Sequence, residues 1–365
     1  MQILGIEPYY GGSHKAFLEG WSANSRHNWR IWQLPAYKWK WRMRGAAVTF
    51  AERFERQRDK YDLIFCSDMF NLAEFKGIVD TGNDIPTVIY FHEIQLTYPV
   101  QDEEQRDYQY AFTNMSSALA ADCVWFNSEF HRTSFLKALE DFLKRMPDNQ
   151  PMQAVDAIRD KSSVYPPGIE KIEESGEPEK NDEPLRILWA ARWEYDKNPD
   201  DFFTALKVLK QEGFDFKLDV IGKRFREYPE IFGWAREYFA GHITRWGYRE
   251  NRDEYVQALG DADVLVSTAR HEFFGLSALE AAGAGTAVIL PDRLAYPEIF
   301  KKDEQGREFF YDGSVEELVE KLKRMIKMKR EGKIEQLKYQ ACDIAIRYHW
   351  GRHSKVLDDG LEAVI

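Results

Sequence analysis

Cysteine is scarce in this 365-residue chain, in which Cys66, Cys123 and Cys342 lie far apart. Such scattered thiols fit neither a disulfide framework nor the paired spacing of a zinc site. No apolar run approaches the roughly 18 residues that a membrane helix needs. The N-terminus, MQILGIEPYY, lacks a basic segment and a long apolar core, so we expect a first β-strand there and not a signal peptide. These absences favour a cytoplasmic protein without stable membrane association.

Positive charge is also in deficit, with 50 Lys and Arg against 61 Asp and Glu, a formal net charge of -11. An acidic protein is not a general binder of polyanions, so any contact with nucleic acid requires a local basic patch. No repeat with a period of 20 to 50 residues is present, which argues against solenoids and propellers. The hydrophobic fraction of 44 % supplies real cores, and the length suits two domains.

Short apolar segments alternate with longer helical patterns in both halves of the chain. The expected strands are 2–7, 61–67, 87–93, 123–128 and 162–167, followed by 186–192, 216–222, 263–269 and 286–291. Strands that are apolar on both faces indicate parallel sheets covered by helices. We therefore predict an α/β fold that binds ligands at the carboxyl ends of its strands.

A charged segment with Gly and Pro, 167–184, divides the two halves and is typical of a solvated linker. We expect an N-terminal domain at 1–166 and a C-terminal domain at 185–345. The last residues, 346–365, have a helical pattern, and we expect this helix to pack back toward the N-terminal domain.

The segment HEFFGLSALEAAGAG, 271–285, places Glu272 and Glu280 on either side of an apolar stretch. It follows an expected strand and starts a helix, so the N–H groups of Phe274, Gly275 and Leu276 lie near a helix N-terminus. Such groups bind anions, for example a diphosphate. The two carboxylates can then accept hydrogen bonds from sugar and ribose hydroxyls. The structural alternative is a capping acid and a surface acid.

Other charged and glycine-containing loops also follow expected strands. Arg192 and Lys197 come after RILWAA and can neutralise a diphosphate leaving group, although two surface cations explain them as well. VIGKRF, with Gly222 and Lys223, and RWGYREN, 245–251, are weaker signals that could frame a base.

The N-terminal half offers two further strand-end motifs. Gly11 and Gly12 permit unusual backbone torsions and close ligand approach. They lack the third glycine of the dinucleotide fingerprint, and a tight turn explains them equally well. His92 and Glu93 end an expected strand, and this position favours a role in a ligand cleft for His92 over a structural one.

A dense basic and aromatic segment, YKWKWRMRG, occupies 37–45. As a strand it would separate the cations from the tryptophans on opposite faces, and as a loop it would offer both to one partner. Cations and rings together suit the phosphates and bases of RNA. An amphipathic edge with solvated Lys and Arg is an equal alternative.

Taken together, these residues resemble the retaining nucleotide-sugar glycosyltransferases of GT-B fold, family four. The family's motif positions match here at Glu272, Glu280, Arg192, Lys197, Gly11, Gly12 and His92. The resemblance implies two Rossmann-like domains with parallel sheets that face each other across a cleft, with the donor mainly on the C-terminal domain. Ala191 and Asn198 stand where the family usually has glycine, which puts the shape of the diphosphate loop in question.

The N-terminal half is similar to a narrower group, the tRNA-queuosine alpha-mannosyltransferases, in EPYYGGSHK, LPAYKWKWRMRG, SDMFNLAEFKG and YFHEIQLTYPVQ. This similarity implies GDP-mannose as donor and the cyclopentenediol of queuosine, in the anticodon of an aspartate tRNA, as acceptor. The resemblance to the GT-B family implies front-face attack, for which no protein nucleophile is required. No cofactor is expected, and no metal, because no Asp-x-Asp motif ends a strand.

The resemblance assigns roles residue by residue. The expected catalytic residues are Arg192, Lys197, Glu272 and His92; the expected donor-binding residues are Gly11, Gly12, Gly222, Lys223, Phe274, Gly275, Leu276 and Glu280; the expected tRNA-binding residues are Lys38, Trp39, Lys40, Trp41, Arg42, Arg44 and His14. Three alternatives stay open: a glycosyltransferase for a glycan, lipid or small molecule, a non-catalytic sugar-nucleotide or RNA-binding module, and a GT-B epimerase or phosphorylase.

Overall fold

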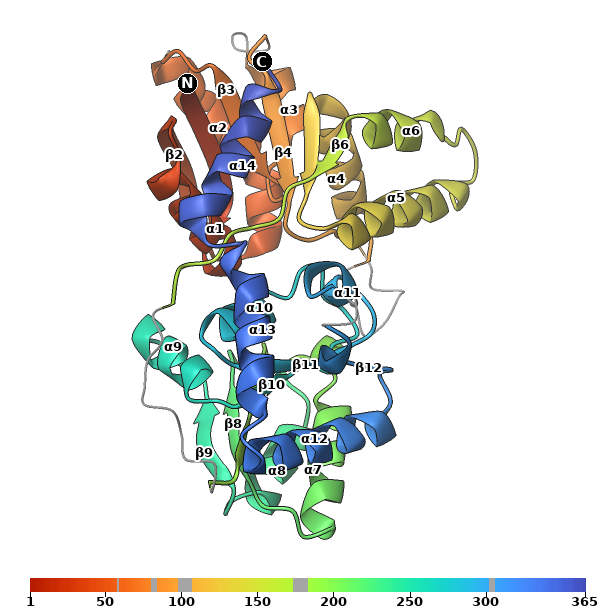
Figure 1. Ribbon diagram of the computed structural model, residues 1–365. Helices are drawn as coiled ribbons and strands as arrows, with labels where there is room; N and C mark the ends of the chain where they lie inside the picture. The colour runs from red at the N-terminus through yellow and green to blue at the C-terminus, as the bar shows by residue number, and fades with distance from the viewer. Residues whose placement is uncertain (58, 80–83, 98–106, 173–182, 302–305) are drawn as a thin grey trace. The chain divides into compact units, whose positions relative to one another are not determined.

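A computed structural model describes the chain except for residues 58, 80–83, 98–106, 173–182 and 302–305. The chain forms two compact units (Figure 1). The first comprises Met1–Gly168 and Trp350–Ile365, and the second Ile169–His349. The linker expected at 167–184 falls mostly on 173–182, outside the described residues. Within the described part of the chain, every helix is too short or too polar to cross a bilayer.

The first unit contains a six-stranded sheet in the order β2-β1-β3-β4-β5-β6. Its strands are β1 Gln2–Tyr10, β2 Asn28–Pro35, β3 Leu63–Ser67, β4 Thr87–Phe91, β5 Cys123–Phe126 and β6 Ser162–Val164. Its helices are α1 Gly12–Asn24, α2 Trp39–Gln57, α3 Leu72–Ile78, α4 Tyr108–Ala120, α5 Glu129–Lys144, α6 Gln153–Asp160 and α14 Trp350–Glu362. All of its strand pairs are parallel, as the sequence predicts.

The C-terminal helix α14 completes the core of the first unit. Trp350, Leu357 and Leu361 pack in one cluster with Phe17, Trp21 and sheet residues such as Phe65 and Tyr90. Trp21 Nε1 donates to Asp358 Oδ1 at 2.8 Å. Gly20 permits this packing, because a Cβ there would lie 2.0 Å from the Trp350 ring.

The second unit contains another six-stranded parallel sheet, in the order β12-β11-β10-β7-β8-β9. Its strands are β7 Leu185–Ala190, β8 Phe216–Ile221, β9 Ile243–Gly247, β10 Val264–Val266, β11 Ala287–Pro291 and β12 Phe310–Tyr311. Its α-helices are α7 Pro199–Gln211, α8 Ile231–Tyr238, α9 Arg252–Gly260, α10 Leu276–Gly283, α11 Tyr296–Ile299, α12 Val315–Arg330 and α13 Ile334–Ile346; the 3-10 helices are η2 Tyr195–Lys197 and η3 Arg307–Phe309. The predicted α/β architecture of parallel sheets is therefore confirmed.

A buried ionic cluster fixes two helices to the second sheet. Asp263, just before β10, accepts hydrogen bonds from Lys338 Nζ at 3.1 Å and from the Arg186 N–H at 2.8 Å, and pairs with Lys329. Lys329 and Asp263 are both almost fully buried. Because an unpaired buried charge is costly, Asp263 holds α12 and α13 in place.

The interpretation of 37–45 as a strand or loop is wrong, because α2 begins at Trp39. Lys38 adopts a left-handed conformation, with φ 52°, and the chain then continues as a helix. Its buried positions, which have helical spacing, are Met43, Ala46, Ala47, Phe50, Ala51 and Phe54. Most of them lie after residue 45, so a short window conceals the 3.6-residue period.

Each expected strand is present, with ends within three residues of the prediction. The edge strand β2 was not predicted, because its exposed Asn28, Arg30 and Gln33 interrupt the apolar pattern. The two-residue strand β12 is too short to give a periodic signal.

Candidate active site

The loop after β10 leads into α10 as the sequence predicts. Gly275 is the N-cap residue of α10 and has a left-handed conformation, with φ 89°. A Cβ at this position would lie 2.5 Å from the Tyr296 ring, so glycine is required. The first N–H groups of a helix have no acceptor within the helix. The N-terminus of α10 therefore lies where the sequence predicts anion-binding backbone, at Gly275 and Leu276.

Glu272 uses its carboxylate to shape this loop. Its Oε1 accepts hydrogen bonds from the N–H groups of Phe273 at 3.2 Å and of Phe274 at 3.4 Å. The Phe274 N–H, which was expected to face the diphosphate, therefore already has a protein acceptor. The N–H groups that follow at the α10 N-terminus are therefore the remaining candidates for anion binding.

Lys197 lies directly beside Glu272. Its Nζ is 3.3 Å from Glu272 Oε2 and 3.1 Å from Asp196 Oδ2, and it donates to the His271 carbonyl oxygen at 2.7 Å. Burial alone would raise the pKa of Glu272, but the Lys197 ammonium holds that pKa below its ordinary value. Burial opposes the charge of Lys197 as well, yet Glu272 and Asp196 raise the pKa of Lys197. Both side chains are therefore ionised at neutral pH.

Arg192 lies in the same loop region, with its Nε 3.1 Å from Glu194 Oε2. Its positive charge also lowers the pKa of Glu272, although less than Lys197 does. The Arg192 side chain is 39 % exposed, so a ligand can reach it. The second unit thus brings Arg192 and Lys197, from the loop after β7, near Glu272, from the loop after β10.

Gly222 and Lys223 run alongside the Arg192 loop. The Ala191 N–H donates to the Ile221 carbonyl at 3.2 Å, and the Trp193 N–H donates to the Lys223 carbonyl at 3.0 Å. Gly222 has φ 153°, and a Cβ there would lie 1.7 Å from the Ala191 oxygen. The two loops can approach this closely only with glycine at 222.

Asn198 explains how the Lys197 loop tolerates the absence of a glycine. It adopts a left-handed conformation with φ 51° and precedes Pro199 at the start of α7. Asparagine is among the few residues that adopt this conformation readily. The replacement of glycine by Asn198 therefore leaves a left-handed turn in place.

Glu280 lies on α10 and is held by two side chains of α9. Its Oε1 accepts from Arg252 Nη2 at 2.6 Å, and its Oε2 accepts from the Tyr255 hydroxyl at 2.8 Å. Sequence reasoning missed Arg252 and Tyr255, because they lie 28 and 25 positions from Glu280 and no local spacing connects them to it.

The first unit has its own charged cluster near the end of β1. His14 Nδ1 lies 3.0 Å from Glu7 Oε2, and the His14 and His92 rings are 4.1 Å apart between centroids. The His92 N–H donates to Asp68 Oδ1 at 2.9 Å. Glu7, His14 and Asp68 are buried. His14 therefore belongs to this buried cluster and not to the basic segment with which it was grouped.

Burial and charge act differently on these groups. Burial opposes the charge of His14, but the Glu7 carboxylate outweighs it and raises the pKa of His14 to about 9. Burial is the main cause that raises the pKa of Asp68 to about 7. Burial, together with the His14 charge, lowers the pKa of His92 well below its ordinary value. At neutral pH His14 is thus a cation and His92 is neutral.

The donor atoms of Glu7, His14 and His92 lie within 4.8 Å of one another, a spacing that could hold a metal ion. A ligating imidazole must be deprotonated. With a pKa of about 9, the His14 ring is protonated at neutral pH. Metal binding would have to displace this proton. That no metal is needed stays a prediction.

Gly11 and Gly12 form the turn from β1 into α1. Gly12 has φ 55°, and a Cβ on Gly11 would lie 2.5 Å from the Ala36 Cβ. The tight turn by itself thus requires both glycines, whether or not the loop also contacts a ligand.

The basic and aromatic residues of 37–45 divide between two environments on α2. Trp39 is half-buried and packs on Tyr110, with ring centroids 4.9 Å apart. Trp41 and Tyr37 are 76 % and 63 % exposed. The exposed cations of the segment are Lys38, Lys40 and Arg44, whereas half-buried Arg42 donates to the Pro35 carbonyl. The helix therefore presents an exposed tryptophan among lysine and arginine side chains.

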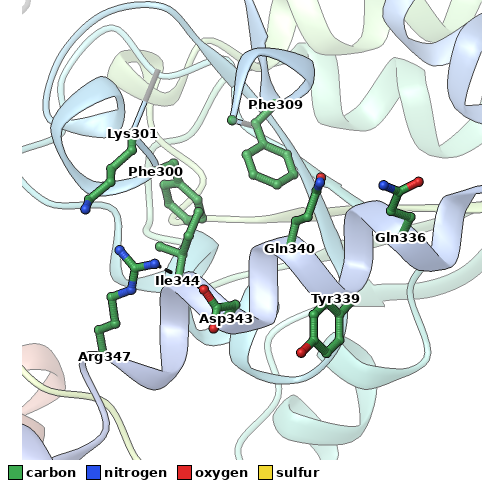
Figure 2. Close-up of a pocket in the computed structure, with 10 residues that line it drawn as sticks. Phe300, Lys301, Phe309, Gln336, Tyr339, Gln340, Asp343, Ile344 and Arg347 are labelled. Carbon is green, nitrogen blue, oxygen red and sulfur yellow. Dashed lines mark hydrogen bonds and ion pairs between the residues drawn. The ribbon is translucent and has the colours of Figure 1, made fainter. Parts of the chain in front are cut away.

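A separate cavity of about 320 Å³ lies in the second unit. Figure 2 shows Gln336, Gln340 and Ile344 of α13 opposite Phe300 and Phe309. Its lining includes none of the residues that the sequence indicates for the donor. We assign it no role.

Comparison with solved structures identifies the fold. Over the whole chain, the structure superimposes on sucrose-phosphate synthase from Thermosynechococcus elongatus with a TM-score of 0.73, at 16 % identity and 99 % coverage of that chain. A trehalose-6-phosphate protein from E. coli bound with UDP-2-fluoro glucose gives a TM-score of 0.72 at 13 % identity, with both chains fully covered. These likenesses confirm the predicted GT-B class.

Sequence comparison is more specific. Residues 2–169 match the model of the tRNA-queuosine alpha-mannosyltransferase N-terminal region, and residues 170–342 match glycosyl transferases group 1. The chain is 38 % identical over 311 residues to a tRNA-queuosine alpha-mannosyltransferase of Drosophila melanogaster, covering 82 % of each protein. A glycogen synthase of Mycobacterium tuberculosis is 31 % identical over 106 residues, 29 % of this chain and 25 % of that one. The chain is therefore a glycosyltransferase and belongs to the tRNA-queuosine alpha-mannosyltransferase family.

Proposed function

We propose that this chain transfers mannose from GDP-mannose to queuosine in tRNA, with retention of the alpha configuration. The observation that carries the proposal is the extent of the likeness to the Drosophila protein, 82 % of both chains. In contrast, a GDP-mannose-dependent alpha-(1-6)-phosphatidylinositol dimannoside mannosyltransferase of Mycobacterium tuberculosis matches 33 % of this chain at 29 % identity. That partial match supports a GDP-mannose donor, and the longer one supports queuosine in tRNA as the acceptor.

The charges of the second unit suit departure of a nucleoside diphosphate. In the reaction, the bond between the mannose C1 and the β-phosphate oxygen breaks while an acceptor hydroxyl oxygen bonds to C1. The leaving phosphate takes the hydroxyl proton. Arg192, Lys197 and the N-terminus of α10 stabilise the negative charge that develops on the phosphate. These groups supply positive charge without a metal, and no residue is required as a nucleophile.

The carboxylates supply the remaining donor contacts of the second unit in this proposal. Glu272 binds hydroxyls of the mannose, and Glu280 binds the ribose. For His92, Gly11 and Gly12, the roles expected from the family resemblance stay predictions. The neutral imidazole of His92, with its lowered pKa, can donate one hydrogen bond and accept another.

The exposed face of α2 is the proposed contact for RNA. Trp41 offers a ring on which a base can stack, and Lys38, Lys40 and Arg44 offer charge for phosphates. In a chain of net charge -11, such a local cluster favours contact with one part of the tRNA over general binding.

The decisive experiment is nucleoside mass spectrometry on queuosine-containing tRNA after incubation with the protein and GDP-mannose, with UDP-sugars in parallel. We expect queuosine to gain one hexose with GDP-mannose alone. Donor hydrolysis without a mass gain would reject the tRNA acceptor and favour a glycan, lipid or small molecule. Binding of the nucleotide without any turnover would favour a non-catalytic module, and a changed sugar on the nucleotide would indicate an epimerase.

A further inference from the structure

The carboxylate of Glu280 is held on both oxygens by one neighbouring helix. Arg252, the first residue of α9, reaches Oε1 at 2.6 Å, and Tyr255 reaches Oε2 at 2.8 Å. The Arg252 guanidinium also lies 5.1 Å from the centre of the Tyr255 ring. Residues three apart on a helix share a face, so α9 presents both donors toward α10 together.

The N-terminus of α9 is itself well fixed. The Asn251 side chain accepts a hydrogen bond from the Asp253 N–H at 2.8 Å and caps the helix. Burial and the Glu280 carboxylate raise the pKa of Tyr255 well above its ordinary value, so the phenol keeps its proton and remains a donor. Both partners of Glu280 are therefore hydrogen-bond donors at neutral pH.

An ionised carboxylate has about four acceptor positions on its two oxygens. Arg252 and Tyr255 use one on each oxygen, which leaves one on each for two neighbouring hydroxyls. Glu280 retains 17 % side-chain exposure, so these positions are not sealed off. A free glutamate side chain would lose rotamer freedom on binding a ligand, whereas this one is already ordered.

We propose that Arg252 and Tyr255 are positioning residues of the donor site, which orient the Glu280 carboxylate so that it binds the ribose hydroxyls and selects ribonucleotides over deoxyribonucleotides. This inference rests on the proposed function, because it takes Glu280 as the ribose ligand. The competing explanation is that the contacts merely tie α9 to α10, in which case they would not affect which sugar the nucleotide carries.

The test compares the affinities of GDP, 2′-deoxy-GDP and 3′-deoxy-GDP by calorimetry, for the wild-type protein and for Arg252→Met, Arg252→Lys and Tyr255→Phe. Loss of a hydrogen bond to a charged group weakens binding about tenfold or more, so the wild type should bind at least one deoxynucleotide about tenfold more weakly than GDP. In R252M and Y255F we expect GDP to bind several-fold more weakly and the preference for GDP over that deoxynucleotide to fall toward one. R252K should restore part of the preference.

Two further variants calibrate the result. Glu280→Gln should abolish the preference directly. Arg324→Met removes a comparable ion pair in the same unit, Arg324 Nη2 to Glu308 Oε1 at 2.8 Å, and should leave both the affinities and the preference unchanged. Thermal melts of all variants would report any loss of folded protein.

Equal weakening of all three nucleotides by R252M and Y255F, with the preference intact, would overturn the inference in favour of a purely structural tie. Failure of the proposed function has a different signature. If the wild type binds UDP and not GDP, the proposed donor is wrong, and the same variants tested with UDP and its deoxy forms still decide the role of Arg252 and Tyr255. A wild type that binds a ribonucleotide and its deoxy forms equally would overturn the ribose role of Glu280 itself.

Discussion

The two units place a carboxylate beside a cation near a strand end, but they use different cations. In the second unit, Lys197 lies between Glu272 and Asp196, and its raised pKa keeps it charged throughout the neutral range. In the first unit, the cation is His14 beside Glu7, with a pKa of about 9. The loop of the second unit therefore keeps its cation throughout the neutral range, whereas the cluster of the first unit loses its cation as the pH rises through about 9.

The largest expected effect is on kcat/KM, from removal of a positive charge in the second unit. Arg192→Ala should lower kcat/KM for mannosyl transfer by 100-fold or more, because loss of a group that stabilises developing charge costs about 10²–10³ in rate. Arg192 is 39 % exposed, so the fold should survive. Steady-state kinetics and circular dichroism would check both statements.

A matched control is Lys323→Ala, which removes a cation that pairs with Glu212 and Glu320 elsewhere in the same unit. Its turnover should equal that of the wild type. Near-normal turnover in Arg192→Ala would remove this residue from the proposed site.

The titration of His14 in the first unit should make the free energy of unfolding depend on pH. The pKa of His14 is raised to about 9 in the folded state from an ordinary value near 6.5, so its stabilising effect is fully present below pH 6.5 and lost as the pH rises through 9. From pH 7 to pH 9 the free energy of unfolding should fall by about 2 kcal/mol. Urea unfolding at several pH values measures this change.

His14→Gln is the control for the stability profile, since an amide can still donate to Glu7 but does not titrate. Its stability should vary much less over the same interval. A variant that loses stability as steeply as the wild type would assign the effect to groups other than His14.

A smaller effect is expected at the exposed face of α2. Trp41→Ala should raise KM for queuosine tRNA about tenfold, because stacking of one base on an aromatic ring contributes about 1–3 kcal/mol. GDP affinity should stay unchanged. Val48→Ala, which truncates another exposed apolar residue of α2, is the matched control, and equal effects of both substitutions would argue against stacking on Trp41.

Removal of metal ions is expected to have no effect on activity. Prolonged treatment with EDTA should leave mannosyl transfer unchanged, because Arg192, Lys197 and the α10 N-terminus provide the positive charge. If activity were lost and then restored by one divalent ion, the Glu7, His14 and His92 cluster would become the first place to look for the metal.

Local sequence was sufficient wherever one short segment carries the whole geometry. The strand, glycine turn and helix around Glu272 could be predicted because β-branched residues, Gly275 and the helical pattern after it follow one another directly. The sequence also placed Lys197 and Glu272 in loops at the carboxyl ends of parallel strands. Their ion pair joins residues 75 positions apart and is seen only in the tertiary structure.

Other features could not be predicted, since their signals are spread over the fold. Helix α2 was not predicted, because most of its buried positions lie after residue 45, beyond the basic and aromatic segment 37–45. His14 was expected to bind tRNA, yet it is buried against Glu7. The spacing of Glu7 and His14 in the sequence does not by itself predict that their side chains pair.

The sequence by itself determined the alternation of strands and helices and the glycines at tight turns, because backbone conformation and hydrophobic periodicity are local properties. The glycosyltransferase family was indicated by the resemblance of its motifs. Only the tertiary structure decided which charges meet. Arg252 and Tyr255 reach Glu280 across 28 and 25 positions, and Lys329 and Lys338 meet at Asp263. Ionic and hydrogen-bond partners depend on distances of about 3 Å, and only the packing of the helices on their sheet brings these groups so close.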